Sequence, residues 1–83
     1  MRRNGKLKED REWLVRLGKQ IEDLIRKRGY KSPYDFWINQ AGDDISRSTL
    51  NYILKGRVDP KATTLRVLAK LLAVKPSKLI DLE

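Results

Sequence analysis

Apolar residues in this 83-residue chain recur every three to four positions, and no segment alternates apolar and polar residues as a strand would. The longest such run predicts a helix from about residue 10 to residue 28, with one apolar stripe made of Trp13, Leu14, Leu17, Ile21, Leu24 and Ile25. Gly18 interrupts this run, at a cost of about 1 kcal/mol relative to alanine, so we expect a close approach of another helix there. The spacing therefore predicts an all-α fold.

Start and stop signals divide the chain into five helices. Ser32 is a good N-cap, Pro33 suits the first helical position, and Asp35 can reach back as a shortened capping box. Ser46 is a second N-cap, and Gly56 can end its helix by adopting a left-handed backbone. The predicted helices cover about 10–28, 33–40, 46–54, 62–73 and a short turn at 76–82. The sequence predicts one compact five-helix domain over residues 10–83.

Residues 1–9 are predicted to form a separate basic arm. Asn4-Gly5 disfavours regular structure there, and a solvated tail without a role is the alternative. If the arm has a role, it would follow a phosphate backbone or enter a neighbouring groove through Arg2, Arg3, Lys6 and Lys8.

Charge and composition narrow the possible functions. The net charge of +8 and the pI of about 10.1 favour a polyanionic partner. The chain has no cysteine and no histidine, which excludes zinc sites of the Cys/His type and histidine-based acid–base catalysis. Asp43 and Asp44 lack further ligands nearby and are interpreted as a solvated turn. We therefore expect no enzyme, no cofactor and no metal. The lack of both cysteine and a long apolar run favours a cytoplasmic protein.

The helix at residues 46–54 has two contrasting sides. Leu50 and Ile53, with Thr49, share one side of the helical period, and Arg47, Ser48, Asn51 and Lys55 fall on the other. Arg47 stands in the first turn, where a cation opposes the helix dipole by about 0.3–1 kcal/mol. Because local rules are broken most often at functional positions, we interpret Arg47 as functional; the alternative is that Asp43 and Asp44 neutralise it. This helix is suited to lie against an anion.

The segment from Ser46 to Val74 resembles the second half of the helix-turn-helix domain of the Cro/λ-repressor-like (XRE) family. The resemblance covers about residues 14–82, and its matching features are Leu17-Gly18, Ile21, Arg28-Gly29, Ser46, Ser48-Thr49-Leu50, Ile53, Gly56-Arg57, Pro60, Thr64-Leu65, Leu68-Ala69 and Leu72. The resemblance implies a five-helix bundle whose third helix enters the DNA major groove, usually as a two-fold dimer on a palindromic operator.

The resemblance also assigns roles to individual residues. Arg47, Ser48 and Asn51 would face the bases, because arginine can pair with guanine and asparagine with adenine. The phosphate contacts that set the register would come from Ser46, Lys55 and Arg57.

Two features depart from the family pattern. Pro33 stands where the family often has a glutamine that contacts phosphate or braces the groove helix, and the hydroxyl of Tyr34 is our candidate replacement for the phosphate contact. The connection at residues 39–45 is two or three residues longer than usual, and Trp37 stands where a small residue is common. The angle between the two helices is therefore expected to differ.

The C-terminal residues suggest a dimer interface. Val74, Leu79, Ile80 and Leu82 exceed what so short a turn is expected to bury within one chain. We expect a homodimer that uses these four residues.

The leading functional hypothesis is a sequence-specific double-stranded DNA-binding transcriptional regulator, with repression as its expected role. One alternative within this class is the antitoxin of a toxin–antitoxin pair, which would bind both an operator and a toxin protein. Another class is a protein-interaction module that has lost DNA binding, for which Pro33 and the longer connection are the best support. A membrane-surface role is disfavoured because Glu22 and Asp23 stand among the bases of the first helix.

Overall fold

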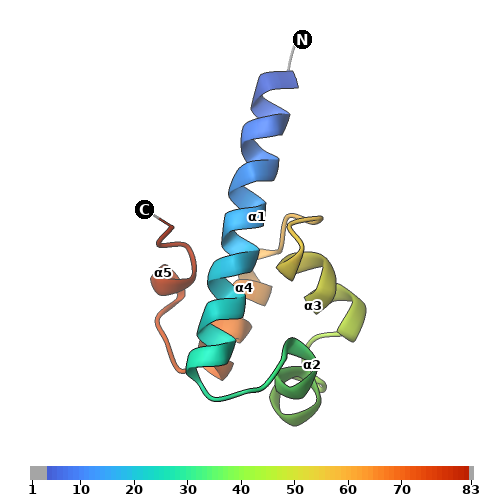
Figure 1. Ribbon diagram of the computed structural model, residues 1–83, viewed down its shortest axis with the longest axis vertical. Coiled ribbons are helices and arrows are strands. Elements are labelled where there is room, and N and C mark those ends of the chain that lie inside the picture. Colours follow the sequence, from blue (N-terminus) through green and yellow to red (C-terminus); the bar gives the residue numbers. More distant parts are fainter. Residues whose placement is uncertain (1–3, 83) are drawn as a thin grey trace.

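The structure, a computed structural model, describes residues 4–82. Within this range the chain forms five helices and no strands, if α2 and the π-helical turn η1 that continues it are taken as one helix (Figure 1). The elements are α1 (Asn4–Lys27), α2 (Pro33–Phe36), η1 (Trp37–Ala41), α3 (Arg47–Leu54), α4 (Ala62–Leu71) and α5 (Pro76–Leu79). The predicted all-α five-helix fold is confirmed. No helix in the described range is long and apolar enough to cross a membrane.

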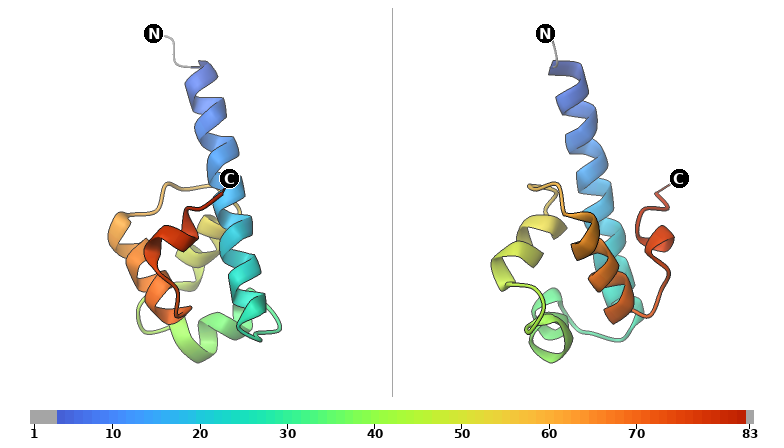
Figure 2. Two further views of the ribbon diagram at one scale, coloured as in Figure 1. Left: turned by 90° about the vertical axis from the view of Figure 1, so that its left-hand side faces the viewer. Right: turned by 180° about the vertical axis from the view of Figure 1, so that it is seen from behind.

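The core forms where α2, α3, α4 and α5 surround the C-terminal half of α1 (Figure 2). Its buried side chains are Leu17, Ile21, Leu24, Ile25, Phe36, Ala41, Ile45, Leu50, Ile53, Leu68, Ala69, Leu72 and Leu79. Each of the five helices contributes at least one of them, so no helix can be removed without exposing apolar surface. The buried positions of α1 repeat at helical spacing, as predicted.

Helix α1 begins six residues before its predicted start. Its N-terminal part extends beyond the other helices (Figures 1 and 2), so the expectation that Asn4-Gly5 disfavours regular structure there was wrong. A helix that is already nucleated adds each further residue at little cost, and the polar residues after Gly5 are good helix formers. Trp13 lies in this part, near Asp59 of the loop that follows α3, and remains 39% exposed rather than joining the core.

The C-terminal segment is buried more completely than expected. Leu79 is fully buried in the core, and Val74 and Leu82 pack against it as half-buried residues. The side chains of Arg16 and Gln20 on α1 donate hydrogen bonds to the carbonyl oxygens of Leu82 and Lys78, which fix the segment on α1. The expectation that Leu79 belongs to an exposed dimer interface was wrong, because Leu79 is fully buried where α5 packs against α4 and α1. Of the four predicted residues, Ile80 is the exposed one, at 48%.

Candidate nucleic-acid interface

Helix α3 is capped and oriented as the sequence predicts. Ser46 precedes the helix in an extended conformation, and its Oγ accepts a hydrogen bond from the backbone N–H of Thr49 at 3.1 Å. The same hydroxyl donates to Oγ1 of Thr49 at 2.8 Å. Leu50 and Ile53 are buried. Thr49, which was predicted to share their side of the helix, is exposed at the edge of that side. The core therefore holds one side of α3 and leaves the other open to a partner.

Two glycines set the position of α3 against α1. A Cβ atom at Gly18 would lie 2.7 Å from the carbonyl carbon of Leu54, and closer still to its oxygen, which confirms the predicted close approach. Gly56 has φ of +71°, and a Cβ atom there would lie 2.7 Å from the backbone of Val15. Both ends of this contact involve backbone, so α3 cannot shift toward α1 or away from it without losing the fit.

The start of α2 is capped as predicted, with one difference. Ser32 Oγ accepts a hydrogen bond from the backbone N–H of Asp35 at 3.1 Å, and Pro33 is the first helical residue. The carboxylate of Asp35 accepts from the backbone N–H of Lys31 at 2.9 Å, one residue before the N-cap, so the reciprocal bond of a capping box is displaced by one position. This local network fixes the position of Tyr34, which follows Pro33.

Arg47 lies against Tyr34, which joins the first turn of α3 to the first turn of α2. The guanidinium carbon of Arg47 lies 4.6 Å from the centroid of the Tyr34 ring, within the range of a cation–π contact. Among residues 8–82, whose side chains the structure describes, the ion pair is Arg26–Glu22 on α1. The alternative that Asp43 or Asp44 neutralises Arg47 therefore gains no support.

The longer connection between α2 and α3 is taken up by a π turn and by Trp37. The helix that starts at Pro33 widens to π-helical geometry over Trp37–Ala41, which accommodates an extra residue. The indole N–H of Trp37 donates to the carbonyl oxygen of Ile45 at 2.7 Å. The ring lies so close to Gly42 that a Cβ atom added there would be 3.7 Å from it. The turn thus folds back over Trp37, which explains why a large residue stands there.

We expect Trp37→Phe to lower the free energy of unfolding by about 1–2 kcal/mol, because it leaves the part-buried carbonyl of Ile45 without its donor. Urea denaturation measures this. The matched control is Trp13→Phe, the same change at a more exposed indole for which no hydrogen bond is found within residues 8–82, with an expected effect within about 0.5 kcal/mol. Equal losses in both variants would contradict the role of the Trp37 bond.

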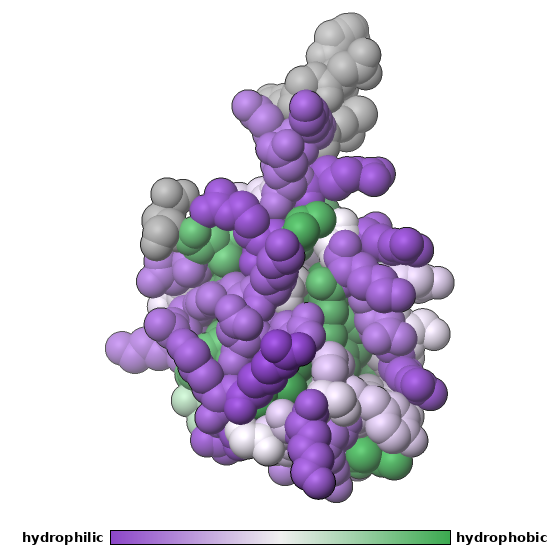
Figure 3. Space-filling model, in the orientation of Figure 1, coloured by the Kyte–Doolittle hydropathy of each residue, from purple (hydrophilic) through white to green (hydrophobic). Residues whose placement is uncertain are grey.

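The three predicted base-reading residues lie together on α3. Arg47, Ser48 and Asn51 are all exposed, and none is buried against the chain itself. Lys55 and Arg57, the predicted phosphate contacts, are exposed just after the helix. We call these five exposed residues, on α3 and just after it, the α3 surface. Figure 3 shows hydrophilic residues over α1 and α3, with hydrophobic surface in the seam between them.

The remaining predicted contacts are placed less favourably. The Ser46 hydroxyl is engaged at the helix cap, so it has no proton left to donate to a phosphate. Lys8 is exposed on the projecting part of α1, and Lys6 lies in the same helix. Arg2 and Arg3 lie outside the described residues.

Tyr52 is a further exposed residue of α3, next to the α3 surface, to which the sequence interpretation gave no role. It lies one helical turn after Ser48 and is 48% exposed. The helical period alone places it beside Asn51, and this signal was available in the sequence.

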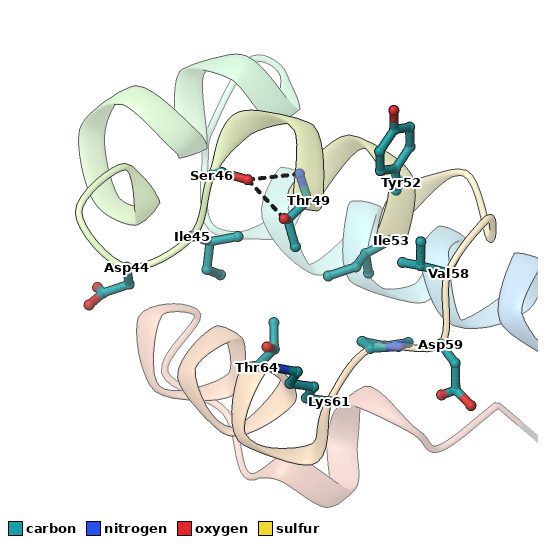
Figure 4. Close-up of a pocket in the computed structure, with 11 residues that line it drawn as sticks. Asp44, Ile45, Ser46, Thr49, Tyr52, Ile53, Val58, Asp59, Lys61 and Thr64 are labelled. Carbon is teal, nitrogen blue, oxygen red and sulfur yellow. Dashed lines mark hydrogen bonds between the residues drawn. The ribbon is translucent and has the colours of Figure 1, made fainter.

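A groove of about 470 Å³ lies between α3 and the start of α4 (Figure 4). Ile45, Ile53 and Val58 line its apolar part, and Tyr52 stands at its edge. The carboxylates of Asp44 and Asp59 lie at its two ends and point away from it (Figure 4). Within residues 4–82 no cluster of three or more acidic side chains could hold a metal ion. The groove therefore extends the α3 surface on the side away from α2.

Residues 40–79 match a protein-family model described as helix-turn-helix. No match was found among curated proteins or among solved structures. The matched segment begins in the last turn of the second helix and includes all of α3, α4 and α5. It supports a DNA-binding helix-turn-helix regulator in general, and this family is a regulatory rather than an enzymatic one. The resemblance of this chain to the Cro/λ-repressor-like (XRE) helix-turn-helix family is therefore confirmed.

Proposed function

We propose that this protein is a sequence-specific double-stranded DNA-binding transcriptional regulator that reads the major groove with α3. The observation that carries the proposal is the division of α3 into a buried side, held by Leu50 and Ile53, and an exposed polar side. An α-helix fits the major groove, where each base pair presents a distinct pattern of donors and acceptors. A helix with one buried side and one exposed polar side, in a protein of net charge +8, meets these requirements.

The roles of the base-reading residues follow from their chemistry. Arg47 would donate two hydrogen bonds to O6 and N7 of a guanine, and Asn51 would pair with N6 and N7 of an adenine. Ser48 can contact either kind of base. Tyr52 joins this set as a fourth residue, because its exposed ring can lie against a thymine methyl group.

Backbone contacts would set the register without reading sequence. Lys55 and Arg57 are the main candidates, and the Tyr34 hydroxyl is a further one. The basic segment 1–9, with Arg2, Arg3, Lys6 and Lys8, would add contacts beyond those of the helix-turn-helix domain at 10–83. From Asn4 onward this segment continues α1. The Ser46 hydroxyl would contact a phosphate only by giving up its bond to Oγ1 of Thr49, so Ser46 ranks behind Lys55 and Arg57 as a phosphate contact.

Repression and a two-fold homodimer complete the proposal. A domain that occupies its operator excludes other proteins from the same DNA, which is the simplest route to repression. Two copies related by two-fold symmetry would place their α3 helices in successive major grooves, about 34 Å apart. Ile80, exposed at the C-terminal end, is the residue we retain for the contact between copies.

A protein-interaction module is the second candidate function. Ile38 is 56% exposed and Tyr34 is 46% exposed, and the two are four residues apart along the helix formed by α2 and η1. Such a pair of exposed apolar side chains suits a protein partner as well as it suits a sugar–phosphate backbone.

Selection of bound duplexes from a random pool tests the proposed function. We expect a preferred sequence with two inverted half-sites about one helical turn apart. Equal recovery of all sequences would contradict sequence-specific reading, and an absence of binding to any duplex at low salt would favour the interaction module.

The salt dependence of binding tests the phosphate contacts. We expect Lys55→Ala and Arg57→Ala each to weaken binding to the selected duplex and to a scrambled one alike, and to lower the slope of log K against log salt by about 1. The matched control is Lys19→Ala, which removes an exposed charge beside Asp81 and Leu82, away from α3. Slopes that fall equally in all three variants would indicate a general effect of net charge and contradict the assigned contacts.

A further inference from the structure

Arg47 stands at a place where the helix dipole disfavours a cation, and the Tyr34 ring compensates for this. A cation in the first turn of a helix opposes the dipole, and within residues 8–82 Arg47 forms no ion pair. Its guanidinium instead lies 4.6 Å from the centroid of the Tyr34 ring, whose face carries partial negative charge. The aromatic face is therefore the counterpart that stabilises a cation at this place.

Tyr34 is itself held from two sides. The cap formed by Ser32 and Asp35 fixes the backbone of the first turn of α2. On the other side the Tyr34 ring lies against Trp37, with ring centroids 6.0 Å apart and an angle of 32° between the planes. Because the backbone of Tyr34 is held by the cap and its ring packs against Trp37, the ring has little freedom to turn away from Arg47.

The contacts form a closed circuit between the two helices. Arg47 contacts Tyr34, Tyr34 contacts Trp37, and the Trp37 indole donates to the carbonyl of Ile45. Ile45 immediately precedes the N-cap of α3, so the circuit returns to the helix on which Arg47 stands. α2 lies next to the N-terminal end of α3 (Figures 1 and 2), and these contacts join the two helices.

We propose that Tyr34 is a positioning residue that holds the Arg47 guanidinium in the orientation needed to read a guanine. The inference rests on the proposed function. A guanidinium carries its N–H donors in its own plane, so a group that lies on an aromatic ring still presents donors at its edge. The ring thus restricts the rotamers of a long side chain before DNA binds, and less conformational entropy is lost when the guanine contact forms. The aromatic face carries this role, and the hydroxyl does not.

Two substitutions at Tyr34 separate the ring from the hydroxyl. Tyr34→Phe keeps the face and removes the hydroxyl, whereas Tyr34→Leu keeps apolar bulk and removes the face. If the ring positions Arg47, Tyr34→Phe keeps the base discrimination of the unaltered protein, whether or not the hydroxyl also contacts a phosphate, and Tyr34→Leu loses part of it. If both variants lose affinity for every duplex alike and keep full discrimination, Tyr34 acts through its hydroxyl alone, and this result would overturn the proposal.

The first measurement uses the free protein. The ¹⁵N relaxation of the Arg47 Nε–H group is expected to report an ordered side chain in the unaltered protein and in Tyr34→Phe, and a mobile one in Tyr34→Leu. Arg57, which is exposed and for which no cation–π contact is found within residues 8–82, is the control and should be mobile in all three proteins. An Arg47 side chain that is equally mobile in all three would overturn the proposal.

The second measurement compares two duplexes. One is the duplex selected from the random pool. The other differs from it by replacement of one guanine, at the base pair for which Arg47→Ala abolishes the preference. Tyr34→Leu should reduce discrimination between the two duplexes by about two- to fivefold, which corresponds to an exposed cation–π contact. In an Arg47→Ala background, Tyr34→Leu should have no further effect on discrimination. Unchanged discrimination in Tyr34→Leu would overturn the inference and leave the proposed function intact. Failure to select any preferred duplex would instead reject sequence reading by α3, and with it the guanine-reading role given to this contact.

Discussion

Replacing Gly56 with alanine is expected to lower the free energy of unfolding by about 2–5 kcal/mol. Two effects act at this residue. Its φ of +71° is left-handed, which costs a residue with a Cβ about 1–2 kcal/mol. The added Cβ would also lie 2.7 Å from the backbone of Val15 on α1, and overpacking of this kind costs about 1–3 kcal/mol. Backbone cannot rotate away as a side chain can, so α3 and α1 must separate.

Gly29 provides the matched control for this prediction. It also has a positive φ, of +96°, but a Cβ atom there would meet nothing within 4 Å. Gly29→Ala should therefore cost only the conformational part, about 1–2 kcal/mol. Urea denaturation of the three proteins gives both differences. Equal losses would mean that the contact with Val15 carries no weight and that the position of α3 does not depend on it.

The same two glycines show what a sequence of this kind can predict. The stops at Gly29 and Gly56 and the N-caps at Ser32 and Ser46 were predictable, because each depends on the residue and its immediate neighbours. The close approach at Gly18 was predictable too, since an interior glycine is costly unless something requires the space. Its partner, the end of α3 at Leu54, was not, because only the fold determines which segment comes there.

Predictions failed where the outcome depended on neighbours far apart in the sequence. The burial of Leu79 depends on α4 and α1, against which α5 packs, and α1 also supplies the hydrogen bonds that fix the C-terminal segment. The early start of α1 reflects the opposite case, in which a helix continues without any neighbour. The π turn at Trp37–Ala41 has no local signal beyond an unusual length of the connection.

In the candidate interface, too, local features were predictable and contacts between distant segments were not. The exposed side of α3 was predictable from the helical period, and Tyr52 could have been included on that ground. The contact between Arg47 and Tyr34 was not, since it joins two helices whose relative angle the sequence left open. The departure at Pro33 from the family pattern indicated that contacts would differ at the start of α2, but it did not indicate that Tyr34 would contact Arg47.

The largest functional effect is expected from removing both bidentate base contacts at once. Arg47→Ala combined with Asn51→Ala should lower the preference for the selected duplex over a scrambled one by about 2–6 kcal/mol, since each good bidentate pair contributes about 1–3 kcal/mol. The lower figure alone corresponds to a loss of about 30-fold in relative affinity. Arg47 and Asn51 are one helical turn apart, so the two effects need not add, and both single variants belong in the same experiment.

Because both side chains are exposed, the double variant should keep its helical circular dichroism and its unfolding midpoint close to those of the unaltered protein. Its affinity for the scrambled duplex should fall only as much as the loss of one positive charge requires. The comparison variant is Lys55→Ala, which also removes one positive charge from the α3 surface but should weaken binding to both duplexes equally. If the double variant behaves in the same way as Lys55→Ala, the side chains of α3 contact phosphates and not bases, and sequence reading must be sought on another part of the molecule.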